Sequence, residues 1–221
     1  MSKIVVLGAG ISGHTAAAHL RRKLGKEHEI LVVSPNRNYQ WVPSNIWVGI
    51  GRMKAKQLIF PLEPLYKRKG IGYKQSKAVS FHPEGDRTET KPYILVEGVY
   101  GDALGKQEKV TYDYLINATG PKLAFDMTEG LNPGTNKAFS VCTYDHAEHA
   151  WQGLKDLIDQ LKKSDKKAKI LIGTGHAKAT CQGAAFEYIL NVEKELVNHG
   201  VRDKVEITWI SNEYHLGDFG M

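Results

Sequence analysis

The sequence predicts an α/β fold in which parallel strands alternate with helices, and three observations support this prediction. A short apolar strand pattern, Ile4–Leu7, leads through a glycine turn and a helical pattern to a second strand pattern, Glu29–Val33. The same order of strand, glycine turn, helix and strand returns at residues 169–210. Continuous apolar runs of this kind are typical of strands buried in a parallel sheet. The two halves therefore indicate one βαβ unit each, as in a distant internal repeat.

The remaining elements follow from apolar spacing and from turn residues. In the first unit, Ala16, Ala17, Leu20 and Leu24 share one helical face, and Gly25 ends the helix. The pattern then predicts a loop (35–43), a short helix (60–68), strands at 72–81, 93–97 and 114–120, and an amphipathic helix (143–162). A lysine-rich connector (162–167), a strand (169–172), a helix (177–199) and a last strand (205–210) complete the chain.

These patterns divide the chain into three predicted parts. Residues 1–122 form the first part of a Rossmann-like domain, and residues 123–167 form a connecting helix and linker. Residues 168–221 begin a second, incomplete domain of the same kind. A doubly wound sheet needs more strands than this second domain supplies. We therefore expect the chain to be the N-terminal part of a longer polypeptide, or one half of a split one.

Composition excludes several classes of protein. With 221 residues, of which 42% are hydrophobic, the chain is long enough for one substantial core. Two cysteines are too few for a disulfide scaffold or for a zinc site made of thiolates alone. No apolar run approaches the roughly 20 residues that span a bilayer. Met1 leads directly into a strand pattern, so we expect a soluble, cytoplasmic chain without a signal peptide.

The net charge of +6 arises from scattered residues. Acidic residues stand among the 30 Lys and Arg nearly everywhere, so nucleic acid is not expected as a partner. The one dense basic run, 162–167, is either a solvated connector or a contact with anionic lipid headgroups. His146 and His149 stand three residues apart, but no further ligand completes a site, so we expect no bound metal.

Gly8, Gly10 and Gly13 form a nucleotide-binding motif in the right context. The sequence Gly-Ala-Gly-Ile-Ser-Gly follows the first strand directly and opens a helix. In such a motif the first glycine permits a tight turn, the second lets a pyrophosphate approach the backbone, and the third lets helix and strand pack closely. The N–H groups at the start of the helix, here including Ile11 and Ser12, attract an anion. The motif therefore predicts dinucleotide binding.

The second strand is not followed by the acidic residue that usually binds the ribose hydroxyls. Ser34 or Asn36 can form a hydrogen bond there instead. Arg37 either faces a phosphate or is solvated. The second glycine turn, 173–175, is followed by Lys178 where a third glycine would stand. This turn is either a nicotinamide site or a structural remnant.

Beyond the glycine loop, three segments make the sequence resemble a family of flavoproteins. Residues 118–122, Ala-Thr-Gly-Pro-Lys, are similar to the turn that two-dinucleotide-binding-domain flavoproteins place near FAD. Residues 140–147 and 181–188 contain one cysteine each. They resemble segments of the sulfide:quinone oxidoreductases and of the flavoprotein subunit of flavocytochrome c sulfide dehydrogenase. The resemblance covers essentially the whole chain but only the N-terminal half of that family, and it implies a Rossmann-like FAD-binding domain.

The resemblance implies that sulfide is oxidised at cysteine thiols and that electrons pass through FAD to a quinone. It makes Cys181 a redox thiol that carries sulfur, and it places Cys142 on the other flank of the flavin. His146 and Glu187 match positions proposed for proton handling, and Asp218 stands where some relatives carry histidine. The cofactor-binding residues implied by the motifs and the resemblance are Gly8, Gly10, Ile11, Ser12, Gly13, Ser34, Asn36, Arg37, Pro43, Ser44, Asn45, Val79, Ala118, Thr119, Gly120 and Pro121.

The local chemistry agrees with a reactive Cys181. It is expected near the start of a helix and follows Lys178 by three residues, and both features favour a thiolate. A thiolate is the form that attacks a sulfur atom or an electron-poor flavin ring. Plain structural interpretations stay open beside this one: the two cysteines as small buried apolar residues, Glu187 as an ordinary helix residue, and Trp41 and Trp47 as packing residues.

Two other functions also stay open. A type II NADH dehydrogenase-like flavoprotein would use the second glycine turn for NADH. A non-catalytic nucleotide-binding or assembly module would not use the cysteines. For the sulfide enzyme we expect sulfide and a quinone as substrates and peripheral membrane contact through parts absent from this chain, while a homo-oligomer is left open.

Overall fold

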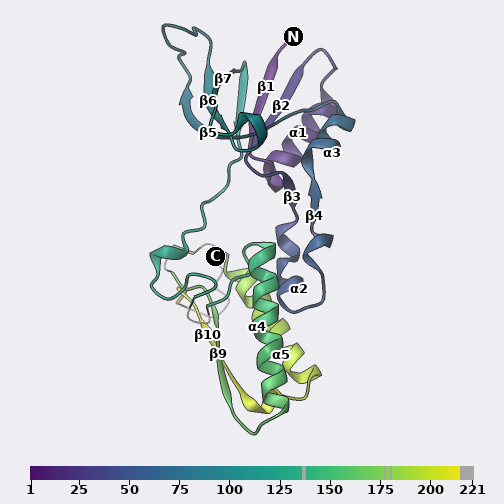
Figure 1. Ribbon diagram of the computed structural model, residues 1–221, viewed down its shortest axis with the longest axis vertical. Coiled ribbons are helices and arrows are strands. Elements are labelled where there is room, and N and C mark those ends of the chain that lie inside the picture. Colours follow the sequence, from purple (N-terminus) through teal and green to yellow (C-terminus); the bar gives the residue numbers. More distant parts are fainter. Residues whose placement is uncertain (136–137, 177, 180, 215–221) are drawn as a thin grey trace. The chain divides into compact units, whose positions relative to one another are not determined.

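The computed structural model describes residues 1–135, 138–176, 178–179 and 181–214 (Figure 1). The chain forms two compact units. The first consists of Met1–Gln40 and Ile59–Lys122. The second consists of Trp41–Leu58 and the described residues from Leu123 onward. The segment Trp41–Leu58 thus packs with the second unit, although the chain on both sides of it belongs to the first.

The first unit is built on a six-stranded sheet with the strand order β7-β6-β5-β2-β1-β8. Its strands are β1 (Lys3–Leu7), β2 (Glu29–Ser34), β5 (Gly72–His82), β6 (Tyr93–Gly98), β7 (Gln107–Thr111) and β8 (Tyr114–Asn117). β1 runs parallel to both β2 and β8, and β2 runs parallel to β5. β5, β6 and β7 form an antiparallel meander at the other edge. The predicted Rossmann-like α/β fold is therefore confirmed.

Both faces of the parallel strands are covered. The helices of this unit are α1 (Ile11–Lys23) and α3 (Leu62–Lys69). Because side chains alternate between the faces of a strand, Ile4 and Val6 of β1 pack with Tyr66 of α3 in one apolar cluster. Val5 and Leu7 point the other way and pack with apolar residues of the meander. Burial on two faces explains why these strands have continuously apolar sequences.

Three short strands of this unit are missed by the sequence analysis. β3 (Asn38–Gln40) and β4 (Ile59–Pro61) form an antiparallel pair, and β3 lies inside the predicted loop 35–43. Three residues are too few to show the alternation that marks a strand. In β7, Val110 is the only buried residue, so this strand shows no apolar alternation either.

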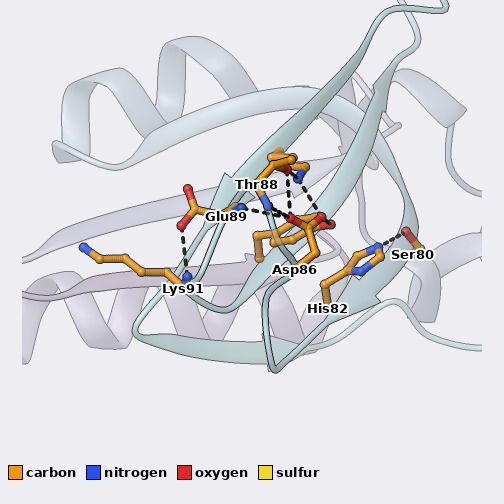
Figure 2. A network of polar contacts seen from close by, with 8 residues as sticks. Ser80, His82, Asp86, Thr88, Glu89 and Lys91 are labelled. Carbon is orange, nitrogen blue, oxygen red and sulfur yellow. Dashed lines mark hydrogen bonds and ion pairs between the residues drawn. The ribbon is translucent and has the colours of Figure 1, made fainter.

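The turn between β5 and β6 is held by one exposed carboxylate, that of Asp86 (Figure 2). It accepts hydrogen bonds from the N–H groups of Thr88 (2.7 Å) and Glu89 (2.8 Å) and from the Thr88 hydroxyl (2.8 Å). The Tyr93 hydroxyl (2.5 Å) and Lys109 Nζ (2.7 Å) also donate to it. These bonds hold the pKa of Asp86 well below its ordinary value, and the bond from Lys109 has the largest effect.

The second unit contains a second βαβ arrangement. Its main elements are α2 (Asn45–Gly49), α4 (Tyr144–Lys162), β9 (Ala168–Gly173), α5 (Gln182–Asn198) and β10 (Val205–Ile210). Short 3₁₀ turns of the chain are η1 (Val42–Ser44), η2 (Ala55–Gln57), η3 (Gly101–Ala103), η4 (Phe125–Met127) and η5 (Arg202–Lys204). β9 and β10 pair in parallel, as predicted for the second unit. The helix expected at 177–199 begins only at Gln182, and residues 177 and 180 lie outside the described residues.

α4 and α5 pack side by side on one face of the β9–β10 pair. Ile170 and Ile172 of β9 point toward the helices and join their apolar cluster. Leu171 points to the other face, where 66% of its surface is exposed. Among the described helices, none combines the length and hydrophobicity needed to cross a membrane.

The segment Trp41–Leu58 is fastened to α5 by two polar contacts. Arg52 donates from Nε (2.7 Å) and from a terminal nitrogen (2.5 Å) to the carboxylate of Glu195, a residue that is only 5% exposed. The Tyr188 hydroxyl donates to the carbonyl of Gly49 (3.0 Å), and burial raises the pKa of Tyr188. These contacts, together with the apolar cluster in which Val48, Ala55 and Leu58 pack with Ala147 of α4, explain why the segment belongs to the second unit.

We predict that acid loosens the β5–β6 turn through Asp86. A carboxyl group whose pKa is lower in the folded protein stabilises the fold above its unfolded pKa of 3.8 and loses this contribution as the pH falls further. Amide hydrogen exchange at Thr88 and Glu89, corrected for its intrinsic pH dependence, should therefore accelerate below about pH 4. In Asp86→Asn, exchange at both amides should be fast at every pH. The control Asp102→Asn, an exposed acid outside the network, should behave like the unaltered protein; equal acceleration there would contradict the prediction.

We also predict that Arg52→Ala lowers the free energy of unfolding of the second unit by about 2 kcal/mol, because it removes the guanidinium from a buried carboxylate that keeps only the contacts with Asn198 and His199. The expected cost is moderate because the Arg52 side chain is itself 53% exposed. Lys169→Ala is the control. This variant removes an ion pair between Lys169 and Glu206, whose side chains are 78% and 61% exposed. Its loss should lower the free energy of unfolding by less than about 1 kcal/mol. Urea unfolding measures both values, and equal small effects would show that the Arg52 pair does not stabilise the unit.

Candidate functional site

The turn after β1 packs directly against the turn after β8. Gly8 has a φ of 92°, which favours glycine, and its N–H donates to the carbonyl of Val33 (2.8 Å). A Cβ at Gly8 would lie 2.2 Å from the carbonyl oxygen of Ala118, closer than side chains can approach. The Ala118 N–H donates in turn to the carbonyl of Leu7 (2.8 Å). Gly8 is therefore required both by its conformation and by the backbone beside it.

Gly10 and Gly13 have very different surroundings. A Cβ at Gly13 would come within 2.0 Å of the Gly8 carbonyl oxygen, so α1 can approach the turn only without a side chain there. A Cβ at Gly10 would have no described atom within 4 Å. No side chain caps the N–H groups at the start of α1, where Ile11 and Ser12 stand, and the first turn contains no acidic residue. This open start of a helix, lined by amides, fits a phosphate group.

The turn after β2 has a fixed shape without an acidic residue. Ser34 is 1% exposed, and its Oγ accepts a hydrogen bond from the N–H of Asn36 (3.3 Å). The Tyr73 hydroxyl donates to the Asn36 carbonyl (2.5 Å), and burial raises the pKa of Tyr73 to about 12. The side chain of Arg37 is exposed, so both of its interpretations stay open.

The turn after β8 is closed by Asn117. Its side-chain oxygen accepts hydrogen bonds from the N–H (3.2 Å) and the hydroxyl (2.8 Å) of Thr119. Gly120 follows with a φ of 70°, and Pro121 is exposed. Because β1, β2 and β8 are parallel, the turns that follow them lie together at the carboxyl ends of the strands. These turns contain the predicted residues Gly8–Gly13, Ser34 and Ala118. Val79 lies further along β5, at a bulge in the meander.

The other predicted residues belong to the second unit, and its two cysteines stand at the starts of helices. Cys181 is the N-cap residue of α5, and Cys142 precedes Thr143, the N-cap residue of α4. Both thiols are free and exposed, so neither cysteine is the buried apolar residue of the alternative interpretation. Pro43 and Ser44 form part of η1, and the buried Asn45 opens α2.

His146 and Glu187 lie on the two helices that begin at the cysteines. His146 stands in the first turn of α4, and its N–H donates to the Thr143 hydroxyl (3.4 Å). Its Nδ1 is buried and has no hydrogen-bond partner among the described residues, while Phe125 packs edge-on against the ring. Glu187 is exposed on α5. Asp218 lies outside the described residues.

Gln182, which follows Cys181 directly, is a candidate that the sequence analysis misses. It is only 7% exposed, and it accepts a hydrogen bond from the Thr174 hydroxyl (2.8 Å). Its amide donates to the side-chain oxygen of Asn212. These bonds fasten the start of α5, and with it the backbone of Cys181, to the loops after β9 and β10. A polar residue between Cys181 and a glycine is visible in the sequence, but its partners are distant along the chain.

The second glycine turn is shaped by close packing. A Cβ at Gly173 would lie 1.7 Å from the Ile210 carbonyl oxygen of β10, and one at Gly175 would lie 2.0 Å from the Leu131 side chain. Packing accounts for both glycines without a bound nucleotide. The structural interpretation of this turn therefore has a physical reason, while the nicotinamide alternative stays a prediction.

Comparison with known proteins relates the whole chain to one group. The family model described as pyridine nucleotide-disulphide oxidoreductase matches residues 2–197. Sulfide-quinone reductase of Aquifex aeolicus (strain VF5) is 30% identical over 218 residues, which are 99% of this chain and 45% of that protein. The mitochondrial sulfide:quinone oxidoreductase of Dictyostelium discoideum is 29% identical over 213 residues, or 96% of this chain and 42% of that protein.

A solved structure gives the same result. The X-ray structure of the sulfide:quinone oxidoreductase from Aquifex aeolicus matches with a TM-score of 0.78 and 28% identity. The match covers 100% of this chain and 45% of that one. The chain thus spans less than half the length of the relatives that it matches.

We predict that two alanine substitutions in the glycine loop affect different properties: one lowers flavin content and the other lowers stability. Gly10→Ala should leave the free energy of unfolding within about 0.5 kcal/mol, because the methyl group meets no neighbour, but it should lower flavin content by filling the space at the amides. Gly13→Ala should cost about 2 kcal/mol, because its methyl group meets the Gly8 carbonyl. Urea unfolding and the flavin absorbance of the purified protein check the pair. Unchanged flavin content in Gly10→Ala would contradict a phosphate position there.

Proposed function

Because the chain belongs to the pyridine nucleotide-disulphide oxidoreductase family, we propose that it is the FAD-binding, cysteine-bearing part of an enzyme that oxidises sulfide and passes the electrons to a quinone. The observation that supports this most is the pair of exposed, free cysteines at the starts of α4 and α5. Both lie within a match to a sulfide-quinone reductase that covers 99% of the chain. The family consists of oxidoreductases, and FAD is the cofactor that it holds in this fold.

The first unit has the features that FAD requires. A pyrophosphate fits the open start of α1 at Gly10, where the helix dipole stabilises a nearby negative charge by about 0.3–1 kcal/mol. The turns with Ser34 and Thr119 supply further polar groups at the carboxyl ends of the same parallel strands. Pro43–Asn45 and Val79 are additional proposed contacts. When bound, FAD supplies an acceptor for two electrons.

Cys181 is the proposed carrier of sulfur. Its thiol and one hydrosulfide ion form a persulfide when together they lose two electrons and one proton, so an S–S bond replaces the S–H bond of the thiol. In the overall reaction the two electrons pass to the quinone. Cys181 stands at the N-terminal end of α5, the positive end of the helix dipole, and the first turn of this helix contains no acidic residue. The buried Gln182 holds the backbone at this position.

His146 and Glu187 are the proposed proton carriers, and Cys142 is the second thiol. The buried Nδ1 of His146 has no hydrogen-bond partner among the described residues, so it is available to accept or donate a proton in the proposed reaction. Glu187 is exposed to solvent on α5. A quinone acceptor requires contact with a membrane, and we propose that this contact is peripheral and is made by parts outside this chain.

The runner-up is a type II NADH dehydrogenase-like activity. The observation in its favour is the second glycine turn, which leads from β9 toward α5 as in a second nucleotide-binding unit. It ranks below sulfide oxidation because packing against Ile210 and Leu131 accounts for both glycines of this turn.

We predict that sulfide, and not NADH, bleaches the visible flavin bands of the full-length protein under anaerobic conditions. Cys181→Ser should keep the bound flavin but slow sulfide-dependent bleaching by at least about 100-fold, because a hydroxyl does not form the persulfide. Ser140→Ala, which removes a hydroxyl that accepts a hydrogen bond from the Cys142 N–H, is a control for local disturbance and should bleach normally.

The result separates the functions. Bleaching by NADH alone would favour the dehydrogenase, and the absence of flavin bands would favour a nucleotide-binding or assembly module. Normal sulfide turnover in Cys181→Ser would overturn the role of this thiol.

A further inference from the structure

We propose that the first unit carries a second binding site, formed by β4, α1 and α3, for a small amphipathic anion: a molecule with an apolar chain or ring and one carboxylate or phosphate group. A groove of about 530 Å³ lies there. Four apolar residues line it: Phe60, Pro61, Pro64 and Leu65. Three nitrogen-bearing side chains complete it: His14, Arg68 and Lys69. No assigned role of the chain uses this groove.

The groove follows one face of α3. Pro61, Pro64, Leu65 and Arg68 are spaced by three or four residues, as on one side of a helix. Glu63 does not line the groove and acts instead on Tyr73, whose pKa is raised first by burial and then by the charge of Glu63. The lining of the groove therefore contains cationic groups and apolar groups but no carboxylate.

The wall of the groove is a packed aromatic cluster. The His14 ring lies 5.0 Å from the ring of Tyr39 and 6.0 Å from that of Phe60, measured between centroids. Its Nδ1 is 3.1 Å from the Tyr66 hydroxyl, and Tyr66 is fully buried. Phe60 stacks on Tyr39 but remains 37% exposed. The apolar wall is thus held in place and still offers surface to a ligand.

The charges of the groove select an anion. Arg68 and Lys69 are exposed and form no ion pair with any residue in the described part of the chain. Burial first, and then the charge of Lys69, lowers the pKa of His14, so Lys69 and His14 lie near one another in the groove lining. Arg21 joins α1 to Gly70, the residue after α3, through a bond to the Gly70 carbonyl (3.5 Å). A ligand without negative charge would leave Arg68 and Lys69 partly desolvated and unpaired.

The size and lining indicate a small molecule. Ligand pockets commonly have volumes of roughly 300–1,000 Å³, a mostly apolar lining and a few polar groups that orient the ligand. This groove has that composition, with the cations of Arg68 and Lys69 at one end of an apolar wall. An apolar chain would cover Phe60 and Leu65, and its acid group would pair with the two cations.

The site is independent of the proposed redox function, although it lies close to the glycine loop. The His14 N–H donates to the carbonyl of Gly10 (2.9 Å) in the first turn of α1. An occupant that packs on the His14 ring therefore contacts a residue whose backbone is bonded to Gly10, where the phosphate is proposed to bind.

Calorimetric titration of the full-length protein with octanoate tests the proposal. Octanoate should bind about tenfold or more tightly than octanol, because only the anion pairs with the cations, and acetate should not bind measurably. The double variant Arg68→Gln/Lys69→Gln should lose at least about tenfold in affinity for octanoate. The control Arg22→Gln/Lys23→Gln removes the same charge from α1 outside the groove lining and should bind octanoate normally. The NMR signals of the His14 ring should shift on binding, and thermal unfolding confirms that both variants are folded.

Equal losses in the two double variants would overturn the site, because they would show a diffuse charge effect. Equal binding of octanol and octanoate would overturn the role of the cations. If octanoate does not bind but vesicles of phosphatidylglycerol, compared with phosphatidylcholine, are captured through Arg68 and Lys69, the face is a lipid surface and the small-ligand proposal is wrong.

Discussion

The close approach of two backbone turns is the constraint on which the first unit depends. Gly8 lies against the Ala118 carbonyl, and Gly13 lies against the Gly8 carbonyl, so three chain segments meet with no room for a side chain. This contact fixes the direction in which α1 leaves β1 and joins β8 to the centre of the sheet. Only Gly10 faces open space, so the turn combines a rigid base with one place where a ligand can reach the amides.

The second unit also combines a fixed base with one exposed residue of the proposed site. Arg52 and Gly49 bind the segment Trp41–Leu58 to Glu195 and Tyr188 on α5, while the side chain of Gln182, the first residue of the same helix, fixes its start. Most of these partners are far apart in the sequence. The polar contacts therefore fix the segment and the start of α5 on one packed helix pair, and Cys181 stands at the end of that fixed structure.

The sequence predicts the elements whose signal is local. The continuous apolar strands β1 and β2, the spacing of the glycine loop and the amphipathic face of α4 each determine their own structure. It does not predict β3 and β4, because three residues carry no periodicity, nor the start of α5 at Gln182, because the fixing bonds come from Thr174 and Asn212. The affiliation of Trp41–Leu58 with the second unit is hidden for the same reason: Arg52 and Glu195 are 143 positions apart.

The surroundings of the two thiols argue for different tasks. The first turn of α4 contains Asp145, and a hydrogen bond from Thr143 lowers the pKa of this carboxyl group, so a carboxylate lies in the helix turn that follows Cys142. The first turn of α5 contains no acid, so an anion at Cys181 meets the positive end of the helix dipole unopposed. Since the proposed uptake of sulfur needs an anionic nucleophile, the helix start at Cys181 suits this step better than the one that follows Cys142. The absence of an acid from the first turn of α5 therefore supports Cys181, rather than Cys142, as the proposed attacking thiol.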